Sequence, residues 1–532
     1  MAITLTFHGA CGIVTGSCME LRTSQTSLLV DCGMFQGTKT VKELNYGTFP
    51  FDPASIKTVL LTHAHIDHCG LLPKLVRMGF DGPIVCTPET ADLLTYVLPD
   101  SGYIQELEVE QLNRRNRRRG RDAVEPIYTR EDAEASLVHL TPRKYGVWIE
   151  IAAGIRARFW NAGHILGSCS VELEVRDKSE APLTLLFSGD IGPGEKAFQA
   201  EPAAPSGVDY LFVESTYGDR VRRRLTAAER RTRLGKEIKA ALRAGGMILI
   251  PSFAIERTQE LLVDLDELFR SGELPATPVF VDSPLAIRAT SVFGKYLARN
   301  GNGRDPFQRA DLHYVESVEQ SKGLARLHGG AIIMAGSGMC DAGRIRHHLK
   351  NYLSHSDTTV LLVGYQAQGS LGRLLRDGAP MVRIQGEEIA VSARIRVLDE
   401  YSGHADQTGL MNWVRDRVPV RREIFLIHGE EEARAGLSEK LVEVGFDERR
   451  ILSPAMGQVM RLSNDGARTL KSRPRIPASA AASDWHNAYA QAVIDLRRQL
   501  ENCKSDQERD RVLGNLREAL RPSHGRKKRR RR

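Results

Sequence analysis

The sequence predicts an α/β protein in which a second α/β domain is inserted into the first. Over the first two hundred residues, short β-rich runs alternate with Gly-rich turns and helical stretches. From about residue 209, short apolar runs separated by helical segments indicate a parallel sheet with covering helices. Near residue 395 the first pattern resumes, and an inserted domain explains this order with the fewest assumptions.

The strands of the first domain are predicted from short runs that are rich in β-branched and aromatic residues. Several of these runs end at polar residues of catalytic type, which is common in α/β enzymes because loops at strand ends carry the chemistry. The predicted strands are Ser27–Asp31, Thr58–Thr62, Ile84–Cys86, Arg156–Trp160, Ser170–Val175, Leu183–Phe187 and, after the insertion, Ile424–Ile427.

The strands of the inserted domain are predicted from short, almost wholly apolar runs, which are typical of strands buried on both faces. They are Tyr210–Val213, Met247–Ile250, Pro278–Val281, Ala331–Met334 and Val360–Val363. The predicted division of the chain is 1–208 and 394–465 for the first domain, 209–393 for the insertion, and 466–532 for a C-terminal extension.

The C-terminal extension is predicted to contain a linker, two helices and a basic tail. Residues 471–482 are rich in Pro, Ala and Ser, as linkers are. Amphipathic patterns follow over 485–500 and from Ser505, where Ser505 and Glu508 form a capping-box pattern, and Pro522 should end the second helix. The sequence leaves open whether these helices pack on the core or pair with a second subunit in a homodimer.

Composition indicates a globular protein without a membrane span. Apolar residues make up 42% and charged residues 26% of the 532 residues, and no run of about 18 apolar residues occurs. The net charge is +8, but the last seven residues, Arg526–Arg532, are all Lys or Arg, so the rest is close to neutral. We expect this tail to contact nucleic acid nonspecifically.

Cysteine usage and the N-terminal sequence favour a cytoplasmic protein. None of the eight cysteines forms a close C-x-x-C pair, so the sequence indicates neither a disulfide framework nor a thiolate zinc site. Residues 1–20 lack the charged and then apolar pattern of a secretory signal.

The strongest local signal is a run of metal-ligating side chains directly after the predicted strand Thr58–Thr62. His63, His65, Asp67 and His68 offer three imidazoles and a carboxylate within six residues, and zinc takes nitrogen and oxygen ligands. Alternate residues of an extended turn can point at one ion, so we expect His63 and His65 to share one metal. Asp67 and His68 would then face a second metal. A His-rich surface loop is the alternative interpretation, which the strand-then-loop context disfavours.

Further ligands are expected at the ends of later strands. His164 lies in a turn flanked by glycines, Asp190 follows the strand Leu183–Phe187, and His428 follows Ile424–Ile427. Taken alone, each is more often a structural residue than a ligand. The cluster at 63–68 makes a shared site the better interpretation, with Asp190 able to bridge two ions.

The H-x-H-x-D-H run, together with a downstream His and a strand-end Asp, resembles the metallo-β-lactamase superfamily. Over about residues 1–465 the further motifs resemble its nuclease branch, the β-CASP family. The resemblance implies a metallo-β-lactamase αββα sandwich with an inserted parallel β-CASP domain, and two Zn²⁺ per chain. It implies one zinc on His63, His65, His164 and Asp190, and a second on Asp67, His68, Asp190 and His428.

The resemblance also implies residues that act beside the metals. Asp31 matches the first family motif and is expected to orient the metal loop rather than to bind metal. Glu214 and His404 match two motifs of the family, and His404 is our candidate general acid for the leaving 3′ oxygen, with Glu214 holding its imidazole. Asp67 is also expected to contact the nucleophilic water. A buried, hydrogen-bonded structural residue is the alternative interpretation of His404.

A phosphate cradle is expected where small residues follow a buried strand. Ser337 and Gly338 lie in such a turn, and backbone N–H groups there could approach a phosphate. Arg344, on a following helix, could line an RNA groove or could simply be solvated. Arg257 fits the pattern of the inserted domain, although relatives often have Gly where this chain has Glu256.

The resemblance favours single-stranded RNA as the substrate. RNA-cutting members carry His at the position of His428, whereas DNA-repair members carry an aliphatic residue. Endonucleolytic cutting is favoured, and additional 5′-to-3′ exonuclease activity is allowed. The alternatives are a DNA-processing nuclease of the same family and a metallo-hydrolase of small esters, which would need no inserted domain. The basic run Arg114–Arg121 is interpreted equally well as an RNA contact or as a solvated helix face, with Arg114 paired to Glu110.

Overall fold

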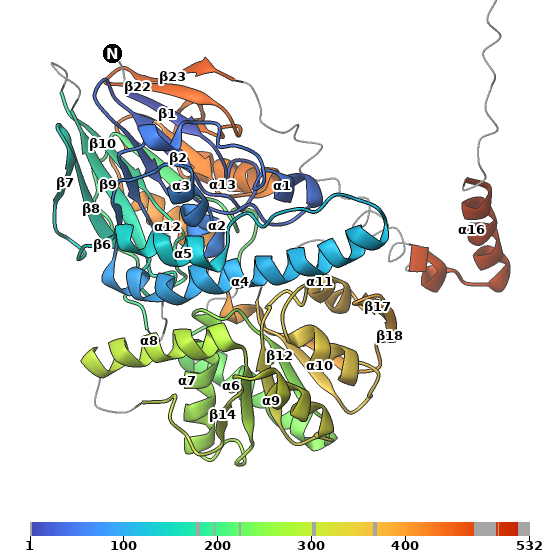
Figure 1. Ribbon diagram of the computed structural model, residues 1–532. Helices are drawn as coiled ribbons and strands as arrows, with labels where there is room; N and C mark the ends of the chain where they lie inside the picture. The colour runs from blue at the N-terminus through green and yellow to red at the C-terminus, as the bar shows by residue number, and fades with distance from the viewer. Residues whose placement is uncertain are drawn as a thin grey trace, which may run out of the picture.

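The computed structural model describes residues 3–472, 496–497 and 499–519, apart from gaps at 177–180, 195, 197, 223–224, 301–304, 365 and 367–369. Two α/β domains lie one above the other, with the long helix α4 running along their junction (Figure 1). We call the upper one the sandwich domain and the lower one the inserted domain. Among the described residues, no helix is both long and apolar enough to cross a membrane.

The sandwich domain contains two sheets that pack face to face. In spatial order the first sheet contains β23 (Gly466–Lys471), β22 (Val459–Ser463), β1 (Ile3–Phe7), β2 (Met19–Arg22), β3 (Ser27–Val30), β4 (Thr58–Leu60), β5 (Ile84–Cys86) and β6 (Leu140–Pro142). The second contains β21 (Ile451–Leu452), β20 (Ile424–Ile427), β11 (Tyr210–Glu214), β10 (Leu183–Phe187), β9 (Cys169–Val175), β8 (Ile155–Asn161) and β7 (Ile149–Ala152). Leu5 and Leu21 of the first sheet meet Phe212 and Phe425 of the second in one buried cluster.

Helices cover the outer faces of both sheets. The helices of this domain are α1 (Lys39–Glu43), α2 (Ile66–Cys69), α3 (Leu72–Arg77), α4 (Pro88–Arg118), α5 (Arg130–Ser136), α12 (Gln407–Arg415) and α13 (Glu431–Glu443). The first sheet packs against α3 and α4 through Leu72 and Leu93, and the second packs against α12 and α13 through Trp413 and Leu437. The result is the predicted αββα sandwich.

The inserted domain has one wholly parallel sheet between two helical layers. The strand order is β14 (Leu312–Tyr314), β13 (Val279–Asp282), β15 (Ile332–Ala335), β12 (Ile248–Pro251), β16 (Thr359–Leu362) and β19 (Arg394–Val397). The helices are α6 (Ala227–Ala244), α7 (Arg257–Arg270), α8 (Pro284–Asn300), α9 (Val318–Gly323), α10 (Ile345–Tyr352) and α11 (Leu371–Arg376), with a hairpin of β17 (Met381–Ile384) and β18 (Glu387–Ala390). One face packs on α6–α8 and the other on α10 and α11.

Strand pairing bears on where the insertion begins and ends. β11, which lies inside the predicted insertion of 209–393, pairs in parallel with β10 and β20 of the sandwich domain. β19, which lies after that range, pairs in parallel with β16 of the inserted sheet. We therefore propose that the insertion runs from about residue 215 to about residue 398. A buried apolar strand has the same sequence pattern in either sheet, so the pattern alone does not assign it to one domain.

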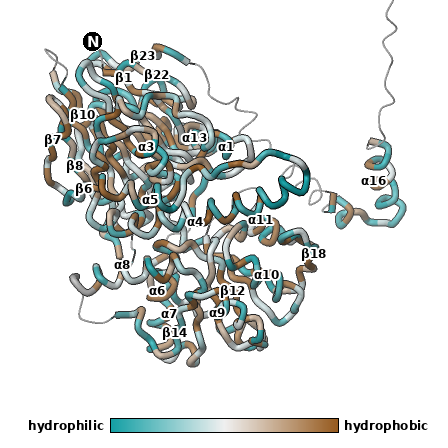
Figure 2. The backbone as a smooth tube through the Cα atoms, in the orientation of Figure 1, coloured by the Kyte–Doolittle hydropathy of each residue, from teal (hydrophilic) through white to brown (hydrophobic). Residues whose placement is uncertain are grey.

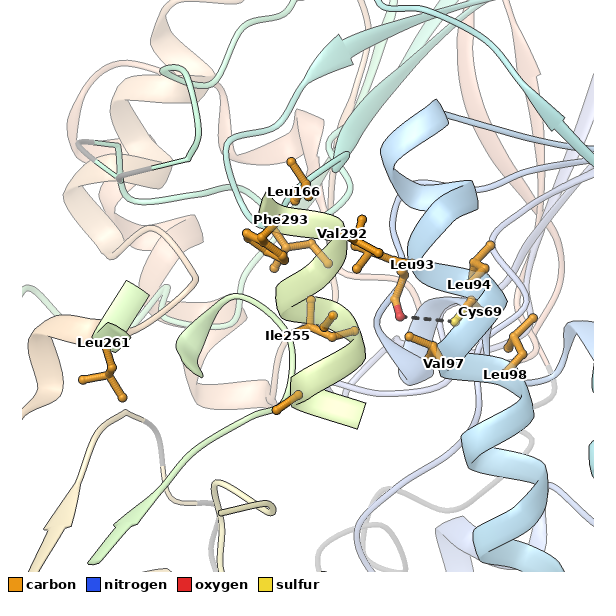
Figure 3. Packing of buried hydrophobic residues seen from close by; sticks show 14 of the residues in the cluster. Cys69, Leu93, Leu94, Val97, Leu98, Leu166, Ile255, Leu261, Val292 and Phe293 are labelled. Atoms are coloured by element: carbon orange, nitrogen blue, oxygen red, sulfur yellow. Dashed lines mark hydrogen bonds between the residues drawn. The ribbon is translucent and has the colours of Figure 1, made fainter. Parts of the chain in front are cut away.

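One apolar core continues across the junction between the domains. Leu93 and Val97 of α4 belong to the same buried cluster as Val292 and Phe293 of α8, and Leu166 and Ile255 belong to it as well (Figure 3). Coloured by the hydropathy of each residue, the chain shows hydrophobic segments in the interior of both domains (Figure 2). The loop that carries Leu166 is thus held between the two domains.

The end of α4 is strongly hydrophilic, and α16 carries many hydrophilic residues (Figure 2). Arg114 pairs with Glu110 at 2.5 Å, as predicted. The predicted second helix of the extension is present as α16 (Asp506–Ala519), and Ser505 Oγ accepts a hydrogen bond from Glu508 N at 3.3 Å. No residue of α16 is buried. Most of the other predicted helix, over 485–500, and the basic tail Arg526–Arg532 lie outside the described residues.

Candidate metal centre and catalytic pair

The side chains of the H-x-H-x-D-H run lie directly after the buried strand β4. The chain leaves β4 at Leu60, and His65 is the N-cap residue of the short helix α2. This change from strand to helix lets neighbouring side chains point in different directions, so that the run supplies ligands to two groups of residues.

The first group contains His63, His65, His164 and Asp190. His65 Nδ1 lies 3.1 Å from both His63 Nε2 and His164 Nε2, and Asp190 Oδ2 lies 3.5 Å from His63 Nε2. Two nitrogens bound to one tetrahedral zinc at about 2.0–2.1 Å are separated by roughly 3.3 Å. The spacing and the nitrogen-rich donor set therefore fit a zinc ion.

The second group contains Asp67, His68 and His428. His68 Nε2 lies 3.2 Å from His428 Nε2, and Asp67 Oδ2 lies 3.5 Å from His428 Nε2. Asp190 faces this group with its other oxygen, since Oδ1 lies 3.3 Å from His68 Nε2. Oδ1 is buried and accepts no hydrogen bond from the described residues, which suits a carboxylate that bridges two cations.

The second nitrogen of most of these imidazoles has a fixed hydrogen-bond partner. His68 Nδ1 lies 2.7 Å from Asp31 Oδ2, and His63 Nδ1 lies 3.0 Å from the hydroxyl of Thr62, which also contacts Asp31. His164 Nδ1 donates to the carbonyl of Gly403 at 2.9 Å. Such partners select the tautomer in which Nε2 is free to bind a metal.

Electrostatics separates the two groups. Burial lowers the pKa of His63 and His164 and lowers that of His65 to about 4, so these imidazoles are neutral, as metal ligands must be. Burial also acts to lower the pKa of His68, but the charges of Asp190 and Asp31 outweigh it and raise that pKa. Cation binding at the second group therefore displaces a proton.

His404 and Glu214 form a pair beside the two groups. His404 Nδ1 lies 3.1 Å and 3.2 Å from the two oxygens of Glu214, and 3.9 Å from Asp190 Oδ2. Glu214 is fully buried at the end of β11 and accepts hydrogen bonds from the backbone N–H groups of Ile191 and Thr216. The His404 side chain is 21% exposed, and no described residue hydrogen-bonds its Nε2. Nε2 is therefore free to exchange a proton with a bound molecule.

The predicted phosphate-binding residues have different surroundings. Ser337 and Gly338 follow β15, where Ser337 Oγ accepts from Ala342 N at 3.2 Å. Arg257 is buried and donates to Glu260 at 3.0 Å. Arg344 donates to Asp282, to the carbonyl of Val315 and to that of Glu316, so its guanidinium already stabilises the end of β13. Phosphate contacts at these four residues stay a prediction.

The sequence analysis gave no role to three residues at the centre, although it noted Glu256 as a departure from the family pattern. Thr62 places its hydroxyl between Asp31 and two ligand imidazoles, and its position just before His63 is the signal that could have found it. Lys196 donates to the backbone carbonyl of His164, and Glu256 accepts from Leu166 N in the same loop. Nothing in the local sequence marks Lys196, because its partners are distant along the chain.

Comparison with known proteins shows three family matches along the chain. The family described as the metallo-β-lactamase superfamily matches residues 11–223, and the β-CASP domain matches residues 258–375. A Zn-dependent metallo-hydrolase RNA specificity domain matches residues 388–450, which include His404 and His428.

Curated relatives match most of the chain. A ribonuclease of Thermus thermophilus is 38% identical over 81% of this chain and 94% of its own length. An RNase J-like protein of Methanocaldococcus jannaschii is 30% identical over 80% of this chain and 93% of its own length. A transcription termination factor of the same organism is 30% identical over 81% of this chain and 67% of its own length.

Proposed function

This chain belongs to the β-CASP family of the metallo-β-lactamase superfamily, and on that premise we propose that it is a zinc-dependent ribonuclease that cuts single-stranded RNA internally. The observation that carries the proposal is the convergence of seven side chains from distant segments into two adjacent groups, with Asp190 of the first group also 3.3 Å from His68 of the second. The free Nε2 of His404 beside these groups adds a proton donor.

Two zinc ions are proposed, one in each group. The first would be held by His63, His65, His164 and Asp190, and the second by Asp67, His68, His428 and Asp190. The nitrogen spacings of 3.1–3.2 Å and the orphaned Oδ1 of Asp190 support this assignment. Asp31 is proposed to orient the second group through its hydrogen bond to His68.

The zinc ions would supply Lewis acidity that activates a water and offsets the negative charge of the phosphodiester. The protein residues handle the protons. Asp67, whose side chain is 21% exposed, accepts a hydrogen bond from the attacking water. As the water attacks phosphorus it gives up a proton towards Asp67, the bond to the 3′ oxygen breaks, and His404 Nε2 gives that oxygen a proton. Glu214 accepts a hydrogen bond from Nδ1 and orients the imidazole for this transfer.

RNA is proposed as the substrate over DNA, and internal cutting over exonuclease action. The RNA specificity domain that matches residues 388–450 and the ribonuclease relative support RNA. The inserted domain and the Glu214–His404 pair favour a nuclease over a hydrolase of small esters, which would need neither. Ser337, Gly338, Arg257 and Arg344 are proposed to contact the RNA backbone directly or to shape the turns that do.

The test is cleavage of a 5′-labelled single-stranded RNA and of the DNA of the same sequence, with and without a chelator. An Asp67→Ala/His68→Ala double variant, purified in parallel, controls for contaminating nucleases. We expect chelator-sensitive cutting of RNA into internal fragments, absent in the double variant. Equal cutting of DNA would overturn the RNA assignment, and release of single nucleotides from one end would overturn internal cutting.

A further inference from the structure

Glu256 occupies an unusual position at the junction of the two domains. It precedes α7 with φ 67° and ψ −56°, and Arg257 N donates to the carbonyl of Ile255 at 2.9 Å, which closes a tight three-residue turn. This conformation is strained for a residue with a side chain. Glycine would adopt it freely.

The Glu256 side chain leaves the inserted domain and enters the loop that carries His164. Its Oε2 accepts a hydrogen bond from Leu166 N at 3.0 Å. The side chain is 3% exposed, and its Oε1 accepts no hydrogen bond from the described residues. Burial raises the pKa of this carboxyl to about 7, and a nearby cation favours its charged form.

Lys196 is that cation, and it also contacts the metal loop. Its Nζ lies 3.8 Å from Glu256 Oε1 and donates to the carbonyl of His164 at 2.5 Å. The Lys196 side chain is 1% exposed. The other charged groups of this interior are Glu260, Arg257, Arg230 and Asp264. Glu260 pairs with Arg257 at 3.0 Å and Arg230 with Asp264 at 3.1 Å, and the charge of Glu260 also acts on Lys196. Glu256 and Lys196 thus hold the same loop at Leu166 N and at the His164 carbonyl.

The remaining contacts of the loop show what this pair adds. Ser168 Oγ accepts from His164 N at 3.0 Å, and Gly167 O accepts from the hydroxyls of Thr87 and Thr90 at the start of α4. These contacts all come from the sandwich domain. Among the described residues of the inserted domain, Glu256 forms a hydrogen bond to the loop between residues 162 and 168. Leu166 of this loop also belongs to the apolar cluster that contains Val292 and Phe293 (Figure 3).

We propose that Glu256 and Lys196 are positioning residues for His164, a buried ion pair through which the inserted domain fixes one imidazole of the metal centre. The inference rests on the proposed zinc site. It goes beyond that site because it makes metal retention depend on a residue of the other domain. Neither residue touches the substrate or the metal.

The test measures zinc release to a chromogenic chelator, without RNA, from the full-length zinc-loaded protein. The variants are Glu256→Gly, Glu256→Gln and Lys196→Met. Glu267→Gln on the same helix is the matched control, because that carboxylate pairs only with the exposed Arg270 among the described residues. Loss of a residue that holds a metal ligand typically weakens binding by about 10–100-fold.

We expect Glu256→Gly and Lys196→Met to release one of two zinc ions about 10–100-fold faster than wild type. Glu256→Gln keeps an oxygen for Leu166 N but loses the charge, so its rate of zinc release should lie between that of the wild type and that of Glu256→Gly. Thermal unfolding separates positioning from general destabilisation. In Glu256→Gly the relief of the strained turn offsets part of the cost of leaving Lys196 without this partner, so its unfolding temperature should fall less than that of Glu256→Gln.

Wild-type zinc release from Glu256→Gly and Lys196→Met would overturn the inference, as would faster release that simply follows a lower unfolding temperature. A failure of the proposed function is distinguishable from either result. In that case the wild-type protein itself would hold no zinc.

Discussion

Replacing His404 by Ala tests the proposed general acid, because His404 lies outside both metal-ligand groups. Its nearest contact with a proposed ligand carboxylate is the 3.9 Å between Nδ1 and Asp190 Oδ2. The variant should therefore keep its zinc. A positioned general acid contributes about 10²–10⁴-fold, which corresponds to roughly 3–5 kcal/mol of barrier. We expect kcat on RNA to fall by that factor.

The assay compares two substrates that differ in how much they need a proton donor. RNA releases a 3′ alkoxide that must be protonated, whereas bis(4-nitrophenyl) phosphate releases a stabilised anion. We expect His404→Ala to lose activity on RNA and to keep most of its activity on the nitrophenyl ester. Glu214→Gln keeps one acceptor oxygen for the backbone N–H groups of Ile191 and Thr216 and removes the charge beside Nδ1, but the imidazole itself stays, so this variant should lose less than His404→Ala on RNA.

Equal losses on the two substrates would refute the general-acid role, since a proton donor has no part in departure of nitrophenolate. Loss of zinc from His404→Ala would refute the placement of His404 outside the metal centre. The zinc content of each variant, measured before the kinetic assay, separates these outcomes.

Three further predictions follow from other parts of the structure. Asp31→Ala removes the partner of His68 Nδ1 and should lower zinc affinity by about 10–100-fold in a chelator competition, and an unchanged affinity would contradict the orienting role. Phe212 stacks between Phe187 and Phe425 at 4.3 Å and 4.8 Å, so Phe212→Ala should cost about 3–5 kcal/mol of unfolding free energy in urea; a loss below 1 kcal/mol would show that the core refills the space. Burial alone would raise the pKa of Glu20, but hydrogen bonds, the first of them from His8, lower it to about 2. Because the carboxyl pKa is lowered in the folded state, the ionised carboxylate stabilises the fold above the unfolded pKa of about 4.5, and this stabilisation is lost as pH falls towards 2. Glu20→Gln should therefore cost about 1–3 kcal/mol of unfolding free energy at pH 7 and little near pH 2. A cost independent of pH would argue against the ionised form as its source.

Twelve strands were predicted from the sequence and all twelve are present, with ends that differ by at most two residues. Buried strands of this kind are short apolar runs bounded by turn residues, so their positions depend on local sequence. Their assignment to a sheet does not. β11 pairs with the sheet of the sandwich domain and β19 with the sheet of the inserted domain, each across the predicted boundary, because tertiary contacts decide the pairing partners of a strand.

The candidate ligands could be found from the sequence because each follows a strand and has a distinctive side chain. Their grouping at 3.1–3.2 Å required the structure. The departure at Glu256 was visible as a Gly position occupied by a charged residue. Its partners were not, because Leu166 and Lys196 lie 90 and 60 residues away along the chain. The hydrogen bond of Arg344 to Asp282 could not be predicted either, because these two residues are also distant along the chain.

The shared core at the junction has a consequence for how the molecule unfolds. Leu93 and Val97 of α4 are buried against Val292 and Phe293 of α8, so separating the domains would expose apolar surface on both (Figure 3). Unfolding of one domain alone would therefore remove part of the apolar packing of the other. Heat or denaturant should therefore reveal a single cooperative unit that spans the insertion, rather than two independent transitions.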